Sequence, residues 1–223
     1  MAIGRLITLA PDDEWGPLPP HADRRRHRFW RALERVLLLI GVISLGYFAY
    51  VSVESRLYQA MENRELDAIL SSAPRHSEPL VPRTRPAPGS VIGRVEIPRL
   101  GVSTIIRAGS DARTLRLAVG HIEGTAFPGE IGNIGLAGHR DTFFRRLRDI
   151  RLGDEIRIVT PDDTFIYKVE DTSVVEPRDT WVLNETPKPV LTLVTCYPFT
   201  YVGSAPNRFI VRADQQPGRV ATR

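Results

Sequence analysis

Cysteine is nearly absent from this sequence, since Cys196 is the only one among 223 residues. A single thiol excludes an internal disulfide, and it makes a poor metal site without several histidines nearby. Oxidising compartments favour paired cysteines, so an exported domain of this chain must take its stability from its core alone. Such a lone residue is either a small buried hydrophobe or a catalytic nucleophile.

Lysine is also scarce, with only Lys168 and Lys188, and nearly all other basic residues are arginine. The formal charge is +4, and the arginines are spread along the chain instead of gathering on one element. This distribution favours a composition bias over nucleic-acid binding, so no nucleic-acid partner is predicted. The apolar share of 42% and the charged share of 25% are typical of a globular protein. No internal repeat is visible.

One run, Val36 to Val53, contains no charged residue. As a helix it would cover about 27 Å, close to the thickness of a hydrocarbon core. A cleaved signal peptide would have a shorter apolar region and an N-terminal region far shorter than residues 1–35, with a small-x-small site directly afterwards. None of these features is present, so the run is predicted to be an uncleaved signal-anchor helix.

The charges around this run predict its orientation. Six arginines precede it closely: Arg24, Arg25, Arg26, Arg28, Arg31 and Arg35. Only two follow closely, among several acidic residues. The basic excess predicts that residues 1–35 are cytoplasmic and that everything after Val53 lies outside the cell membrane.

Residues 54–90 are predicted to connect the anchor to the folded part. The pattern from Val51 to Leu70 suggests that the membrane helix continues outward as a short stalk. Residues 71–90 hold five prolines, which favour extended backbone and make this segment a semi-rigid spacer. The folded domain is predicted over residues 91–213, and residues 214–223 are predicted to form a flexible polar tail.

The folded part has the texture of an all-β protein. Short runs rich in Val, Ile and Thr alternate with Gly, Pro, Asp and Asn, which is typical of a barrel or sandwich. Asp162 and Asp163 are predicted to form a hairpin turn. Helical turns are expected at Thr142 to Arg148 and at Asp111 to Leu115, the second capped by Ser110.

A nucleophilic cysteine needs a neighbouring base or cation, and histidine is the usual partner. Three of the five histidines are excluded by the predicted topology because they lie in the cytoplasmic segment or the spacer: His21, His27 and His76. His121 and His139 remain. Both follow predicted strands, so geometry alone separates them only weakly, and either imidazole could instead hydrogen-bond a loop carbonyl.

Arg208 is the candidate positive charge near Cys196. Acyl transfer builds negative charge on a carbonyl oxygen, which needs donors fixed in place beforehand. The runs VLTLVTC and RFIVRA are expected to be neighbouring strands. This pairing would put Cys196 at the end of one strand and Arg208 at the start of the next. Arg212 is interpreted as a structural charge.

Three blocks give this chain its resemblance to a known family: Leu136-Ala137-Gly138-His139, Thr192-Leu193-Val194-Thr195-Cys196 and Arg208-Phe209-Ile210-Val211. The chain resembles the sortases, membrane-anchored cysteine transpeptidases, and the run AGHRDTFFRRL points to class D/E. The resemblance implies a closed eight-stranded β-barrel with short helices after one transmembrane helix. It also implies Cys196 as nucleophile, His139 as general acid/base and Arg208 as stabiliser of substrate and oxyanion. Thr195, Tyr197 and Gly138 would support the site or contact substrate, whereas His121 matches no catalytic position.

The resemblance further implies a reaction. An LPxTG-like sorting signal would be cleaved after its threonine through a thioester, and the product passed to an amine of a peptidoglycan stem peptide or a pilin lysine. Some relatives bind calcium through an acidic loop cluster; no matching cluster is seen, so no metal or other cofactor is predicted.

Two alternatives remain at this point. One is another cell-wall cysteine transpeptidase or hydrolase, such as an L,D-transpeptidase, although Thr195 before Cys196 does not fit the Ser-x-Gly-Cys element of those enzymes. The other is a non-catalytic, membrane-tethered barrel that only binds peptides.

Overall fold

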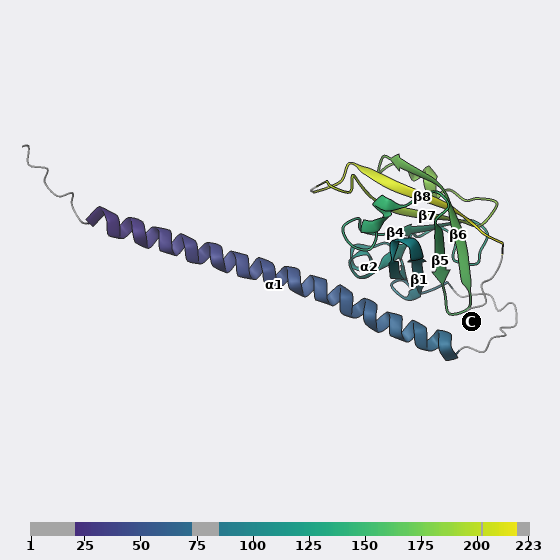
Figure 1. Cartoon of the computed structure of the whole chain (residues 1–223), viewed down its shortest axis with the longest axis horizontal. Coiled ribbons are helices and arrows are strands. Elements are labelled where there is room, and N and C mark those ends of the chain that lie inside the picture. Colours follow the sequence, from purple (N-terminus) through teal and green to yellow (C-terminus); the bar gives the residue numbers. More distant parts are fainter. Residues whose placement is uncertain (1–20, 73–84, 202, 218–223) are drawn as a thin grey trace, which may run out of the picture. The chain divides into compact units, whose positions relative to one another are not determined.

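The computed structural model describes residues 21–72, 85–201 and 203–217 (Figure 1). The chain forms two compact units, divided after Tyr50. The first contains most of helix α1 (His21–Ser72), and the second contains the end of α1 and all of the strands. The predicted spacer falls largely outside the described residues, since 73–84 are not among them.

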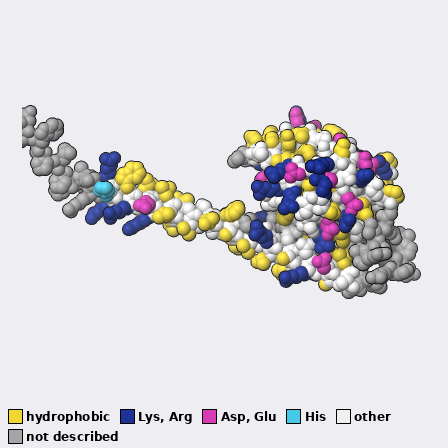
Figure 2. Space-filling model, in the orientation of Figure 1, with side chains coloured by type: hydrophobic (Ala, Val, Ile, Leu, Met, Phe, Trp, Pro, Cys, Tyr) yellow, Lys and Arg dark blue, Asp and Glu magenta, His cyan; other side chains and the backbone are white. Residues whose placement is uncertain are grey.

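In the first unit, α1 presents apolar side chains to its surroundings. Leu37, Leu39 and Phe48 are all more than half exposed. Figure 2 shows apolar side chains along this helix and basic ones towards its N-terminal end. Within the described residues, α1 is the helix that is long and apolar enough to cross a membrane.

The second unit is a closed barrel of eight strands in the order β1-β2-β3-β4-β7-β8-β6-β5. The pairs β2–β3 and β4–β7 are parallel and the others are antiparallel. The strands are β1 (Val91–Ile97), β2 (Val102–Ala108), β3 (Val119–His121), β4 (Asn133–Ala137), β5 (Glu155–Val159), β6 (Thr164–Val175), β7 (Val190–Tyr197) and β8 (Asn207–Gln215). The short helices are α2 (Ala112–Leu117), η1 (Pro98–Leu100), η2 (Arg145–Asp149) and η3 (Thr180–Leu183). The predicted all-β barrel with short helices is therefore confirmed.

Alternate residues of each strand fill the barrel. In β7, Leu191 and Leu193 are fully buried in the main core, and in β8 Val211 and Ala213 contribute to the same cluster. Because successive side chains of a strand point to opposite faces, the residues between them face outward. Strand β8 continues to Gln215, beyond the predicted domain boundary at residue 213.

Two local predictions can be compared with the structure. The turn at Asp162 and Asp163 joins β5 to β6 in an antiparallel pair, as expected. The predicted Ser110 cap is wrong, because Asp111 is the residue that caps α2. Its carboxylate accepts hydrogen bonds from the backbone of Arg113 at 2.9 Å and of Thr114 at 3.1 Å. The hydroxyl of Ser110 instead donates to Glu123 at 2.9 Å.

Candidate active site

Cys196 lies near the end of β7 and is half-buried. Its neighbour Thr195 is buried, with 2% of its surface exposed. Since side chains alternate along a strand, Cys196 faces away from the core that Thr195 faces. The pairing of β7 with β8 places Cys196 directly opposite Arg208.

Arg208, at the start of β8, is held by the loop that precedes it. Its Nη1 donates to the carbonyl of Asn207 at 2.9 Å and to that of Ala205 at 3.3 Å. The side chain is half-buried. These bonds hold the guanidinium, which carries a permanent charge, against the end of the loop that joins β7 to β8.

His139 reaches the same place from β4. Strand β4 runs parallel to β7, with Ala137 opposite Val194. The amide of Gly138 donates to the carbonyl of Val194 at 3.1 Å, which extends this pairing past the end of β4. The hydroxyl of Thr195 donates to the carbonyl of Gly138 at 2.7 Å. The residue before His139 is thus bonded to the residue before Cys196.

Gly138 is needed for packing at this point. A Cβ atom added there would lie 2.7 Å from the ring of Phe144, closer than real Cβ contacts come. Phe144 is fully buried in the core, and its amide donates to the carbonyl of His139 at 3.1 Å. A larger residue at 138 would push against a ring that cannot move outward, and would disturb the backbone that presents His139.

Together these elements surround one cavity of about 300 Å³. The residues that line it are His139, Arg140, Asp141, Cys196, Gly203, Ser204, Ala205 and Arg208. The structure therefore brings together the three predicted catalytic residues from β7, β8 and the segment after β4. His139 itself is exposed, so an imidazole there can exchange protons with groups in the cavity.

Arg140 is the residue at this site that sequence reasoning missed. Only 6% of its surface is exposed, and its buried guanidinium donates to three carbonyls of the β7–β8 loop. Nη1 bonds Pro198 at 2.6 Å, and Nη2 bonds Tyr201 and Gly203, the latter at 3.2 Å. The available signal was its place next to His139, inside the run AGHRDTFFRRL. Arg140 ties the segment after β4 to the loop that carries one wall of the cavity.

Tyr197 and His121 do not line the cavity. The Tyr197 ring packs against Phe199 and Phe209, with centroids 6.0 and 6.2 Å apart, so it supports the end of β7. His121 is 2% exposed and stacks on Phe127 at 4.2 Å. Its Nε2 lies 2.8 Å from the carbonyl of Ala126. Burial lowers the pKa of His121 below its usual value, because the charged imidazole loses solvation.

Among residues 21–72, 85–201 and 203–217, no three His, Cys, Asp or Glu side chains gather in a way that could hold a metal ion. The side chains that line the cavity provide one thiol, one imidazole, two guanidinium groups, one carboxylate and one hydroxyl. This set suits nucleophilic attack on a carbonyl followed by proton transfer.

Comparison with known proteins identifies the family. The Sortase family model, which describes the sortase domain, matches residues 95–216, more than half of this chain. This chain belongs to the sortase family. Sortase D of Bacillus subtilis (strain 168) is 33% identical to it over 184 residues, covering 78% of this chain and 93% of that protein. Sortase SrtE1 of Streptomyces coelicolor is 31% identical over 194 residues, covering 75% of this chain and 53% of that protein.

A solved structure gives the same result. A Clostridium perfringens sortase D5 transpeptidase is 31% identical and superimposes with a TM-score of 0.57, covering 74% of this chain and 99% of that one. The sortase described here is therefore a class D/E-type member, and its closed barrel is the sortase fold. Sortases are transpeptidases of the cell envelope, which is the level of function that family membership establishes for this chain.

Proposed function

We propose that this sortase is a cysteine transpeptidase that cleaves an LPxTG-like sorting signal between its threonine and the following glycine or alanine. The observation that carries the proposal is the shared cavity: Cys196 and Arg208 from paired strands, and His139 from a distant segment, line one opening of about 300 Å³. A structural role for Cys196 in the core would instead require it to face the barrel interior, as Thr195 does.

The chemistry proceeds in two acyl transfers. The Cys196 thiolate attacks the threonine carbonyl carbon, and Arg208 stabilises the negative charge that forms on the oxygen. The C–N bond then breaks, and His139 gives a proton to the departing amine, leaving a thioester on Cys196. An incoming amine attacks this thioester and gives up its proton to His139. The new amide leaves, and the thiolate is restored.

The acceptor amine belongs to a peptidoglycan stem peptide or to a pilin lysine, and water would give hydrolysis instead. The enzyme is held in the cell membrane by the apolar part of α1, with its N-terminus in the cytoplasm and its barrel outside. The exposed apolar side chains of this helix and the arginines before it support that arrangement. Substrates with their own apolar C-terminal segment would share the same membrane, which raises their effective concentration at the site.

Replacing the nucleophile tests the proposal. In the full chain reconstituted in nanodiscs, Cys196→Ala is expected to abolish both peptide cleavage and the thioester adduct seen by mass spectrometry, because no other thiol exists. His139→Ala should retain the thiol but lose turnover by roughly 10²-fold or more. Cleavage that persists in Cys196→Ala would refute the nucleophile.

Iodoacetamide labelling separates this enzyme from a barrel that only binds peptides. A nucleophilic Cys196 is expected to react in the native protein, with a pH profile that changes in His139→Ala. A thiol that reacts only after unfolding, in a protein that still binds the sorting peptide, would favour the non-catalytic barrel.

A further inference from the structure

The last turns of α1 pack against the barrel. We refer to residues 54–72 as the stalk; they belong to the same compact unit as the strands. Leu66 is only 3% exposed, in a helix whose residues are mostly exposed. It contacts Ile105 and Ala118, both fully buried, and Leu70 adds to the same cluster. These contacts form a small second core outside the main one.

Gln59 completes the hydrogen bonding between two barrel segments. The parallel pairing of β2 with β3 begins at Ile106 and Val119, because β3 is short. Just before this point, the amide of Ile105 donates to Oε1 of Gln59 at 2.9 Å. Nε2 of Gln59 donates to the carbonyl of Leu117 at 2.8 Å. A carboxamide has the same donor and acceptor as a peptide group, so Gln59 bridges the gap as a strand residue would.

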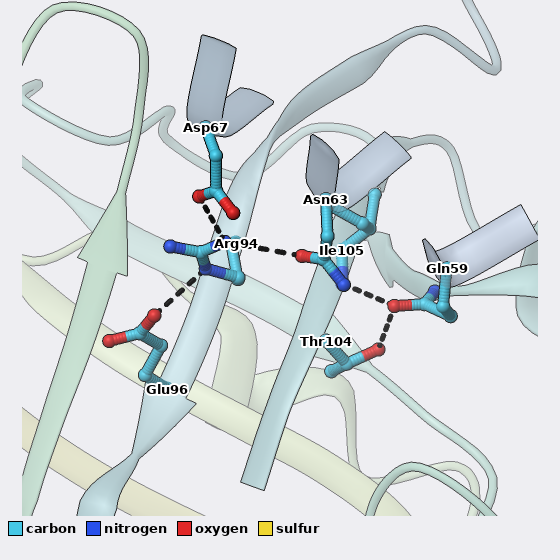
Figure 3. A network of polar contacts seen from close by, with 7 residues as sticks. All are labelled: Gln59, Asn63, Asp67, Arg94, Glu96, Thr104 and Ile105. Atoms are coloured by element: carbon cyan, nitrogen blue, oxygen red, sulfur yellow. Dashed lines mark hydrogen bonds and ion pairs between the residues drawn. The ribbon is translucent and has the colours of Figure 1, made fainter. Parts of the chain in front are cut away.

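The groups that donate to Gln59 are buried. Thr104 is 3% exposed and Ile105 is fully buried. The hydroxyl of Thr104 also donates to Oε1 of Gln59, at 3.1 Å (Figure 3). The docked stalk covers these donors and also supplies their acceptor, so they stay hydrogen-bonded where water cannot reach them.

Charged contacts continue along the same side of the stalk. Arg94 of β1 donates to Asp67 at 2.9 Å and to Asn63 at 3.3 Å, and it also bonds Glu96 (Figure 3). Gln59, Asn63 and Asp67 are spaced four residues apart, which places them on one face of a helix. Near the N-terminal end of the stalk, the guanidinium of Arg107 lies over the face of the Tyr58 ring, 5.2 Å from its centre.

We propose that the outer face of β1 and β2 is a docking surface for the stalk, and that the docked stalk is a structural part of the catalytic domain. The barrel is then joined to its anchor through this interface as well as through residues 73–84. This differs from the sequence-based domain division, in which the stalk was a connector and the domain began at Val91. The proposal does not depend on the chemistry at Cys196.

Hydrogen exchange measured by mass spectrometry on the full chain, at one copy per nanodisc, tests this docking. Gln59→Ala and Leu66→Asp are expected to speed exchange of the β2 amides by roughly tenfold or more, because Ile105 loses its acceptor or the helix lifts away. Met61→Asp is the matched control: Met61 is 68% exposed on the same helix, so exchange should stay at the parental rate.

Exchange at Val211 in β8 shows whether each variant still has a folded barrel, since this residue is fully buried in the main core. Unchanged β2 exchange in both Gln59→Ala and Leu66→Asp, with β8 protected, would overturn the proposal. So would β2 protection that appears only with two copies per nanodisc, because the stalk would then belong to a second molecule. Loss of activity through Cys196→Ala would leave this exchange pattern unaltered.

Discussion

Arg140 shows how much of the site depends on residues that do no chemistry. Its guanidinium bonds three carbonyls of one loop while its neighbour His139 lines the cavity. A planar guanidinium spreads five donors over three nitrogens, so Nη1 and Nη2 reach separate carbonyls, whereas an ammonium group has all three donors on a single nitrogen. Arg140 is therefore a positioning residue for the loop that leads from Cys196 to Arg208.

For this reason Arg140→Lys is expected to lower kcat/KM for transpeptidation by roughly ten- to a hundredfold, since the Arg208 side of the cavity is no longer held in place. The rate of product formation from a sorting peptide and an amine acceptor, followed by quenching samples at set times, provides the measurement. Arg145→Lys is the control, because Arg145 is exposed nearby and should tolerate the change. A parental rate in Arg140→Lys would mean that the loop is ordered without this side chain.

At the scale of elements, the parallel pairing of β4 with β7 sets the distance between histidine and cysteine. The two strands are neighbours in the barrel, and Ala137 is paired with Val194. Because His139 and Cys196 each lie two residues further along, the same alignment brings them to the same end of the two strands. The hydroxyl of Thr195 continues this alignment where the strand pairing ends. Its bond to Gly138 is buried, so water cannot replace it easily.

Thr195→Val removes this hydroxyl with little change of side-chain shape, so the buried Gly138 carbonyl loses the hydrogen bond from it. A loss of about 1–3 kcal/mol in the free energy of unfolding is expected, measured by denaturant titration of the full chain in detergent. Thr195→Ser keeps the hydroxyl and should recover most of the loss. Equal stability of the valine variant and the parent would show that the bond contributes little.

At the scale of the whole molecule, an apolar helix and a folded barrel occupy one chain with a single thiol. The excess of arginines on the N-terminal side of the apolar run supports the proposed orientation, in which the barrel lies outside. Because Cys196 lines an open cavity and is the only cysteine, it can report on which side of the membrane the barrel lies.

A membrane-impermeant maleimide is expected to label Cys196 in intact spheroplasts, as detected by a mass shift of the purified protein. The control is a Cys196→Ala chain carrying Ala2→Cys, which should stay unlabelled until the membrane is permeabilised. The opposite pattern, with Cys196 protected until permeabilisation, would reverse the proposed orientation.

The residues that could be predicted from sequence are those whose chemistry or pattern is local. Three features can be recognised from the sequence, because residue type and periodicity carry the signal. They are the single Cys196 in a block that resembles the family, His139 after a glycine, and an apolar run without charged residues. Arg208 followed from the expected pairing of two neighbouring strands. Ser110 was wrongly chosen as the cap of α2, because Ser and Asp are both good caps and only the backbone decides between them.

The sequence by itself therefore determined the candidate catalytic residues, the strand-rich texture and the apolar helix. Only the tertiary structure decided that His121 is buried on Phe127, that Arg140 holds the β7–β8 loop and that Gln59 bridges β2 and Leu117. The partners of Arg140 and Gln59 are backbone carbonyls and amides distant in the chain. Every residue carries such groups, so nothing in the order of amino acids marks which of them will meet a particular side chain.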